Sequence, residues 1–201
     1  MSTKTVSPKL ISELRARTSA GITDCKNALE ESGGDLDKAA ELLRKKGIAK
    51  AEKRAGRSAT QGVVVSYLHH NGQLGVLLEL NSETDFVART DAFIQLARDI
   101  ALHIASADPI AITPEEIPAD LLERERRIAE EQVAQEGKPE AVRGKIIEGK
   151  LKKFVAERSL LEQAYVKDEA KTVGQLVKEV SGKVGEAIAV RRFARFKIGE
   201  A

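Results

Sequence analysis

The chain has 201 residues, which is room for one domain or two small ones with a buried core. Charged residues make up 32% and hydrophobic residues 42%, a composition typical of a soluble globular protein with highly charged helices. A net charge of +2 argues against a nucleic-acid coat, and the single cysteine excludes an internal disulfide or a cysteine-based metal cage. With no signal peptide and no apolar run near the roughly 20 residues of a membrane span, we expect a cytoplasmic protein without membrane contact.

Residues 1–56 predict three short helices that form a small bundle, and we place a domain boundary after residue 56. Ser7 is a natural N-cap before the proline that opens the first helix. Thr23 is expected to cap the second helix and Asp35 the third, which should end at Gly47. None of these helices is long enough to be stable alone in water, so their apolar faces must pack together.

The segment from Arg44 to Arg57, RKKGIAKAEKRAGR, carries seven basic residues against one acid, Glu52. One interpretation is a solvated linker or helix face. The other is a patch that docks on an acidic partner surface or on phosphates. The segment has no aromatic residue on which a base could stack, which weakens the nucleic-acid version.

Residues 62–80 predict a β-hairpin, because Asn71-Gly72 is the strongest short signal for a two-residue type I′ turn. That turn pairs Val63, Val65 and Tyr67 with Leu80, Leu78 and Val76, and this face is expected to be buried. A helix that begins at Thr90 or Asp91 should cover it with Phe93, Leu96 and Ile100.

The loop between hairpin and helix, NSETDFVART from Asn81 to Thr90, places an aromatic residue beside an acid. Phe86 is either the first core residue of the following helix or a side chain displayed for a partner. The residues alone leave both interpretations open.

Residues 120–136 and 140–158 predict two charged helices with a thin apolar stripe, which need a partner helix or another subunit. Thr172 and Gln175 form a capping box for a last helix. The segment AIAVRRFARFKIG then alternates and predicts a final strand, most simply the third strand beside the hairpin. Helices and strands are segregated along the chain, so the predicted class is α+β: a three-helix domain at 1–56, then a core at 57–201 with a small antiparallel sheet of about three strands packed with helices.

No set of residues in the sequence forms a catalytic or metal-binding constellation. His69 and His70 are adjacent on a strand and point to opposite faces, so they make poor ligands for one metal ion. His103 is expected at the core boundary, and Cys25 as a small, half-buried packing residue. Phosphate-binding and nucleophile motifs are absent from the sequence. We therefore expect a non-enzyme without cofactor or metal that binds another protein.

Three motifs in the same order resemble the elongation factor Ts family, the guanine-nucleotide exchange factors of elongation factor Tu. They are TDFVAR after GVLLELNSE, the N-terminal segment LISELRARTSAGITDCKNALEESGGDLDKAAELLRKKG, and LLEQAYVKDEAKTVGQLVKEV with the closing strand. The resemblance covers essentially the whole chain and implies that the first domain has the ubiquitin-associated fold. The length resembles the short bacterial forms, which carry one core module and are expected to form homodimers.

The resemblance also implies which residues act. Thr84, Asp85, Phe86 and Val87 are expected to approach the Mg²⁺ of the partner, with Phe86 as an apolar wedge and Asp85 as a polar contact. A second, softer set is expected to dock the N-terminal domain and its basic segment on the partner: Leu14, Arg15, Thr18, Ile22, Thr23, Lys26, Lys53 and Arg54.

Two other functions remain open at this point. One is a nucleic-acid-binding module without exchange activity, built on the basic segment and the arginine-rich final strand. The other is an enzyme built on His69, His70 and Glu79. Release of GDP from elongation factor Tu, with and without this protein, separates all three.

Overall fold

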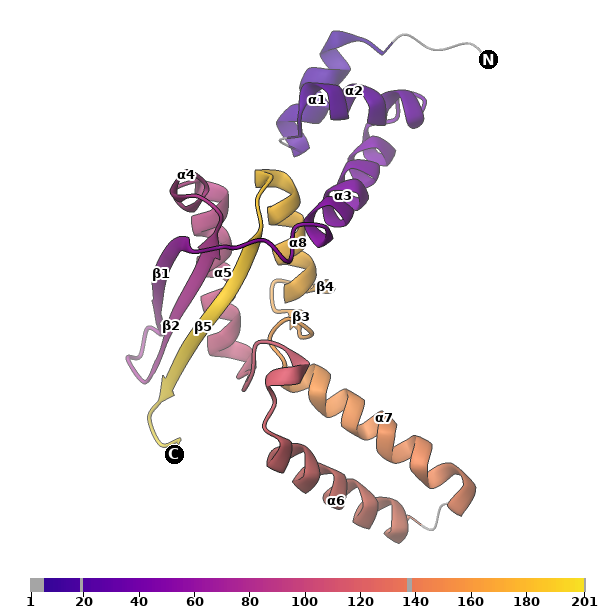
Figure 1. The fold of residues 1–201 in the computed structure, drawn as a ribbon, viewed down its shortest axis with the longest axis vertical. Coiled ribbons are helices and arrows are strands. Elements are labelled where there is room, and N and C mark those ends of the chain that lie inside the picture. Colours follow the sequence, from indigo (N-terminus) through magenta and orange to yellow (C-terminus); the bar gives the residue numbers. More distant parts are fainter. Residues whose placement is uncertain (1–5, 19, 137–138, 201) are drawn as a thin grey trace. The chain divides into compact units, whose positions relative to one another are not determined.

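A computed structural model describes residues 6–18, 20–136 and 139–200 (Figure 1). Helices and strands are segregated along the chain, as predicted for an α+β protein: three helices come first, and a three-stranded sheet with its helices follows. The chain divides into two compact units. Unit 1 contains residues 1–63, 80–96 and 177–191, and unit 2 contains residues 64–79, 97–176 and 192–201.

Unit 1 opens with the predicted three-helix bundle, called the head below. Its helices are α1 (Pro8–Thr18), α2 (Ile22–Glu31) and α3 (Leu36–Glu52). Their small core is built by Leu14, Cys25, Ala28, Leu29 and Ala39, all fully buried. Cys25 is therefore a packing residue of the interior, more deeply buried than we predicted. Its thiol lies 3.7 Å from the Ala20 carbonyl oxygen.

Two of the three expected helix caps are confirmed. The Ser7 hydroxyl accepts from the backbone N–H of Leu10 at 3.3 Å, and the Asp35 carboxylate accepts from the N–H groups of Asp37 and Lys38 at 3.0 Å. The prediction for Thr23 is wrong. Helix α2 begins at Ile22, with Gly21 as the extended N-cap, so Thr23 lies inside the first turn.

The prediction that α3 ends at Gly47 is also wrong, because the helix continues to Glu52. A glycine inside a helix costs only about 1 kcal/mol relative to alanine, which the rest of a long helix can offset. The helix passes close to another helix of unit 1 at this point. A Cβ added to Gly182, on helix α8 (Val173–Val184), would lie 2.7 Å from the backbone carbon and oxygen of Gly47.

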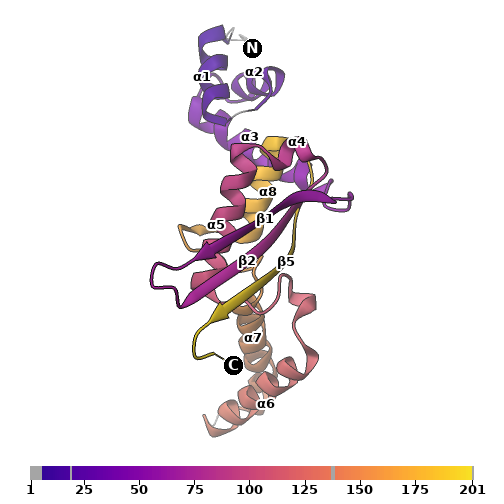
Figure 2. The same ribbon diagram turned by 90° about the vertical axis from the view of Figure 1, so that its left-hand side faces the viewer.

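The main sheet has the strand order β1 (Gln61–Leu68), β2 (Leu74–Ser82) and β5 (Ile188–Lys197). The final strand therefore joins the hairpin, as predicted, and pairs with β2. Figure 2 shows the three strands in front of helix α5 (Asp91–Ala107). The predicted inner face is confirmed: Val76, Leu78 and Leu80 are buried on β2, and the β1 residues on that face are half-buried. Phe93, Leu96 and Ile100 of α5 are also buried, at 2% exposure or less.

The hairpin turn differs from the predicted type I′ turn. Strand β1 ends at Leu68 and β2 begins at Leu74, so the loop is longer than two residues. Gly72 has φ +68°, whereas Asn71 is not among the described residues with positive φ. Asn71 instead accepts from the Gln73 N–H through its side chain, at 3.0 Å. The register is the one predicted, since the His69 N–H donates to the Leu74 carbonyl.

The final strand does not alternate strictly. Ile188 and Val190 are half-buried, Arg191 and Arg192 are both exposed, and the half-buried positions then continue at Phe193 and Arg195. The alternation predicted for this segment is therefore broken after Val190. Phe196 and Ile198 are 71% and 75% exposed.

Unit 2 holds the two predicted charged helices, α6 (Ala119–Gln135) and α7 (Glu140–Arg158), which pack on each other. Ala129 and Val133 are the buried residues of α6. A short hairpin of β3 (Ala164–Tyr165) and β4 (Asp168–Thr172) was not predicted, since its strands are too short to show periodicity. A 3-10 turn, η1 (Pro114–Glu116), precedes α6.

The predicted capping box of α8 is confirmed in both directions. The Gln175 N–H donates to the Thr172 hydroxyl at 3.1 Å, and the Thr172 N–H donates to the Gln175 side-chain oxygen at 3.0 Å.

Candidate functional site

The loop after β2 folds into a single helical turn, α4 (Asp85–Ala88). Thr84 is its N-cap, with extended backbone and a hydroxyl that accepts from the Val87 N–H at 3.4 Å. The next helix follows almost at once, capped by the Thr90 hydroxyl, which accepts from the Phe93 N–H at 3.4 Å. We call residues Thr84–Val87 the display turn.

Phe86 is the residue that the display turn exposes. Its side chain is 81% exposed, whereas the next two residues, Val87 and Ala88, are 9% and 3% exposed. The core interpretation of this phenylalanine is therefore excluded in this structure: Val87 is the residue that anchors the turn to the interior. An exposed phenylalanine on an ordered turn is typical of a binding residue, because it gains free energy only when a partner covers it.

The acid beside it is held by its own helical turn. Asp85 pairs with Arg89 at 2.9 Å, in an i, i+4 arrangement, and the arginine is 80% exposed. An ion pair this open to water contributes about 0–1 kcal/mol, so a partner group can replace the arginine at little cost.

Two carboxylates hold the display turn within unit 1. Glu186, just after α8, accepts from the Thr84 N–H at 3.0 Å and from the Thr84 hydroxyl at 2.7 Å. Glu83 accepts from the Ala187 N–H at 2.7 Å, and Arg57 lies 3.5 Å from the same carboxylate. The bond from Ala187, together with the charge of Arg57, holds the pKa of Glu83 below its ordinary value.

The softer set of predicted site residues lies mostly on the head surface. Arg15, Thr23, Lys26 and Lys53 are exposed, and Ile22 is 59% exposed. Thr18 is half-buried, and its hydroxyl donates to the Leu14 carbonyl at 2.8 Å. Leu14 is fully buried in the head core, so its side chain supports that surface from below.

The basic segment is largely neutralised within unit 1. Five of its seven basic residues pair with acids: Arg44 with Glu179, Lys45 with Glu41, Lys46 with Glu31, Lys50 with Asp24, and Arg57 with Glu83. Lys53 and Arg54 are the two that form no ion pair with another described residue, and one buried guanidinium nitrogen of Arg54 has no hydrogen-bond partner there. These are the two residues that the family resemblance had singled out.

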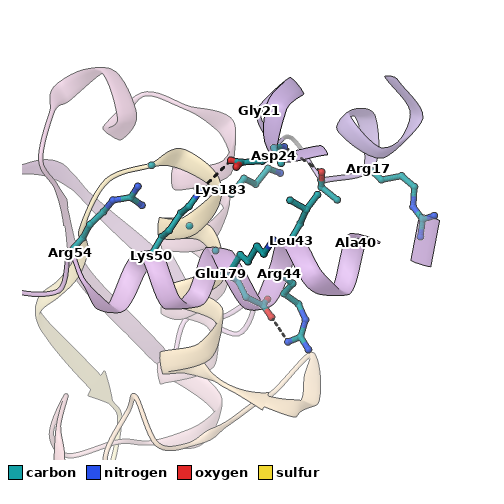
Figure 3. A pocket seen from close by; sticks show the side chains of 16 residues that line it. Arg17, Gly21, Asp24, Ala40, Leu43, Arg44, Lys50, Arg54, Glu179 and Lys183 are labelled. Carbon is teal, nitrogen blue, oxygen red and sulfur yellow. Dashed lines mark hydrogen bonds and ion pairs between the residues drawn. The ribbon is translucent and has the colours of Figure 1, made fainter. Parts of the chain in front are cut away.

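Figure 3 shows a pocket of about 510 Å³ that this segment lines together with α8. The labelled side chains include the pairs Lys50–Asp24 and Arg44–Glu179, so two of its cations are committed to internal acids. Leu43 and Ala40 also line it, and none of its described lining residues is aromatic. The pocket lacks the stacking surface that a nucleotide base requires.

The histidines do not form a site. His69 hydrogen-bonds with the Tyr67 hydroxyl at 2.9 Å, and the His69 and His70 rings lie 4.2 Å apart. His103 is 1% exposed, so our placement of it at the core boundary is wrong: a long helix buries it among Gln163 and Val166. Within the described ranges, no group of three or more His, Cys, Asp or Glu side chains could hold a metal ion. No helix within those ranges combines the length and the apolar character needed to cross a membrane.

These features define a protein-binding factor. They are an exposed aromatic side chain on an anchored turn, a head with an exposed polar surface, and a basic segment in which two cations form no ion pair with another described residue.

Comparison of the sequence with known proteins identifies a family within this class. The family described as Elongation factor TS matches residues 18–200. Elongation factor Ts of Fervidobacterium nodosum is 53% identical over 195 residues, which cover 97% of this chain and 99% of that one. The factor of Geobacter sulfurreducens is 54% identical over 190 residues, covering 94% and 88% of the two chains. That of Desulfosudis oleivorans is 50% identical over 196 residues, covering 98% and 99%.

The chain belongs to the elongation factor Ts family, the nucleotide exchange factors of elongation factor Tu. Exchange makes and breaks no covalent bond, so the protein is not an enzyme. The enzyme alternative built on His69, His70 and Glu79 is thereby set aside, and so is the nucleic-acid module without exchange activity.

Proposed function

We propose that the display turn is the part of this factor that speeds GDP release from elongation factor Tu. In this mechanism Phe86 enters the nucleotide-binding domain of the partner as an apolar wedge near its Mg²⁺, and Asp85 supplies polar contacts. Thr84 and Val87 hold the turn in shape. A bound Mg²⁺ is one of the largest charges holding GDP, so a small shift of its ligands weakens nucleotide binding.

One observation carries this proposal: Phe86 is 81% exposed, although the next two residues are buried and the turn is capped by Thr84. A wedge must be both accessible and rigid, because a flexible loop would lose conformational freedom on binding and weaken the interaction. The hydrogen bonds to Thr84 supply that rigidity before the partner arrives.

The head is proposed to dock on the same domain of the partner through Arg15, Thr18, Ile22, Thr23 and Lys26, with Leu14 supporting that surface. Lys53 and Arg54 are proposed to reach an acidic helix of the partner, since neither forms an ion pair with another residue that the structure describes. The functional division is proposed to follow the predicted domains, with the head and basic segment at 1–56 and the core at 57–201. A factor with this task works in the cytoplasm, where translation takes place.

The factor is also proposed to act as a homodimer through the outer face of its sheet, on unit 2. Apolar side chains that stand exposed on that face include Leu68 at 71%, Leu77 at 50% and Phe196 at 71%. Because Gly75 has no side chain, β2 places none between the flanking strands at that point. The Leu68 side chain lies 3.8 Å from where a Cβ on Gly75 would be. Apolar patches of this kind are typical of protein–protein contacts. Elongation factor Tu and a second copy of this chain are thus the two proposed partners.

The decisive experiment replaces Phe86 by alanine and follows the release of fluorescent GDP from elongation factor Tu. We expect at least a tenfold loss of stimulated release, equivalent to about 1.4 kcal/mol of transition-state stabilisation. The melting temperature should barely change, because the ring is already in solvent. If Phe86 instead supported its own domain, truncation would cost about 3–5 kcal/mol of stability and exchange would be normal in the cold, folded protein.

A second variant checks the polar half of the turn. Asp85→Ala removes the carboxylate and its weak pair with Arg89, so we expect slower exchange at an unchanged melting temperature. Normal exchange by this variant would confine the active contact to Phe86.

A further inference from the structure

We propose that Glu186 and Glu83 are positioning residues for nucleotide exchange, which hold the display turn in its active geometry without touching the partner. This inference rests on the proposed role of Phe86 and extends it to residues far along the chain. The two glutamates, with Thr84 and Ala187, are called the carboxylate clasp.

The clasp is reciprocal. The carboxylate of Glu83 accepts from the Ala187 N–H, and the carboxylate of Glu186 accepts from the Thr84 N–H. Each segment thus binds the backbone of the other through a side chain. Strands β2 and β5 are neighbours in the sheet. Strand β2 ends at Ser82 and β5 begins at Ile188, so the clasp cross-links the two segments just beyond the sheet.

Glu186 contacts the display turn at its cap. Both of its oxygens are used, one on the Thr84 N–H at 3.0 Å and one on the Thr84 hydroxyl at 2.7 Å. The same hydroxyl accepts from the Val87 N–H, so Glu186 fixes the rotation of the group that starts α4. Hydrogen bonds to an ionised acceptor are stronger than those between neutral groups. The direction in which Phe86 points therefore depends on Glu186.

Glu186 is itself fixed by the end of α8. Gly185 adopts φ +83°, a left-handed conformation that reverses the chain after the helix, and its N–H donates to the Ser181 carbonyl at 2.9 Å. The Ser181 hydroxyl donates to the Glu186 carbonyl. The glutamate thus projects from a rigid helix terminus.

Glu83 connects the clasp to the basic segment. Arg57 lies 3.5 Å from the oxygen of Glu83 that does not bind Ala187, and Arg54 adds to the positive potential at this carboxylate. The residues that follow the head thereby touch the support of the turn within unit 1. The Glu83 carboxylate therefore contacts both the segment that follows the head and the segment that holds the display turn.

The test compares wild type, Phe86→Ala, Glu186→Ala and the double variant in the GDP-release assay. If Glu186 acts through the turn, Glu186→Ala should lose about tenfold in stimulated release, and the double variant should lose no more than Phe86→Ala alone. Thr84→Val removes the hydroxyl that Glu186 binds and should be as slow as Glu186→Ala.

Two further measurements separate positioning from loss of stability. Hydrogen exchange at the amides of Thr84 and Val87 should be faster in Glu186→Ala, at a temperature where the variant is folded. Glu157→Ala, which removes an exposed carboxylate paired with Lys153 on α7, is the matched control for charge and should change neither amide protection nor release.

Three outcomes decide the matter. Normal release by Glu186→Ala beside a slow Phe86→Ala overturns the clasp and leaves the wedge standing. Additive losses in the double variant overturn it as well, because the glutamate would then act elsewhere. Normal release by Phe86→Ala overturns the proposed wedge role of Phe86, and with it the positioning role of Glu186.

Discussion

At the scale of single residues, consecutive positions have opposite roles. Val87 is buried and Phe86 is exposed, although both are apolar and both belong to one helical turn. In a turn of four residues only one side can face the core, so the cap at Thr84 decides which of the two is buried. The sequence alone could not decide this, since the choice depends on a carboxylate that lies 102 residues further along the chain.

His103 gives a pH prediction at this scale. Its Nδ1 accepts from the Val166 N–H at 3.2 Å, so Nε2 carries the proton and donates to Gln163 at 2.9 Å. Burial lowers the pKa of this histidine, against the opposing effect of the Gln163 bond. The unfolded chain therefore takes up a proton at about pH 6.5 while the folded chain does not.

The free energy of unfolding should accordingly fall as the pH drops below about 6.5, and the loss should level off below the lowered pKa of the folded state. Unfolding by urea at a series of pH values between 7.5 and 5 measures this directly. His103→Gln removes the titrating group and should flatten the curve in that range. Parallel curves for the two proteins would show that His103 does not contribute to the acid response.

At the scale of elements, the sequence predicted the long periodic segments well, and the helix ends and turns less well. The helices at α6 and α7, the sheet order, the inner face of the hairpin and the α8 capping box all follow from local pattern. The errors at Gly47 and in the Asn71 turn have one cause. Glycine and asparagine signals state what a backbone tolerates, and tertiary contacts decide whether that freedom is used.

The glycine pair between α3 and α8 turns this point into a prediction. A Cβ on Gly182 would lie 2.7 Å from the Gly47 backbone, so Gly182→Ala must push the helices apart and should cost about 1–3 kcal/mol of stability. A Cβ on Gly47 would meet the Gly182 Cα at 3.7 Å, an ordinary contact, so Gly47→Ala should be neutral or stabilise by up to about 1 kcal/mol.

Thermal unfolding, with hydrogen exchange along α3 to detect local separation, measures both variants. Equal behaviour of the two alanine variants would contradict the close approach at Gly182. The pair is a matched control, since each change adds one methyl group to the same contact.

At the scale of the whole molecule, charge is balanced locally. The net charge is +2, and most cations of the basic segment are paired with acids nearby. Long-range attraction to a nucleic acid is therefore weak, and recognition of the partner depends on shape and on a few uncommitted groups. The same reasoning directs attention to the apolar side chains that stand exposed on the outer face of the sheet.

The last prediction concerns that face. In a homodimer formed there, light scattering at micromolar concentration should give about twice the 21.8 kDa of one chain. Phe196→Asp places a charge at a side chain that is 71% exposed in the single chain, so the fold should remain intact while the dimer dissociates. Phe86→Asp makes the same change on the display turn and should leave the mass unaltered, although exchange should fail. A wild-type protein that scatters as a monomer and exchanges at full rate would remove the dimer, because the apolar face would then have no part in the function.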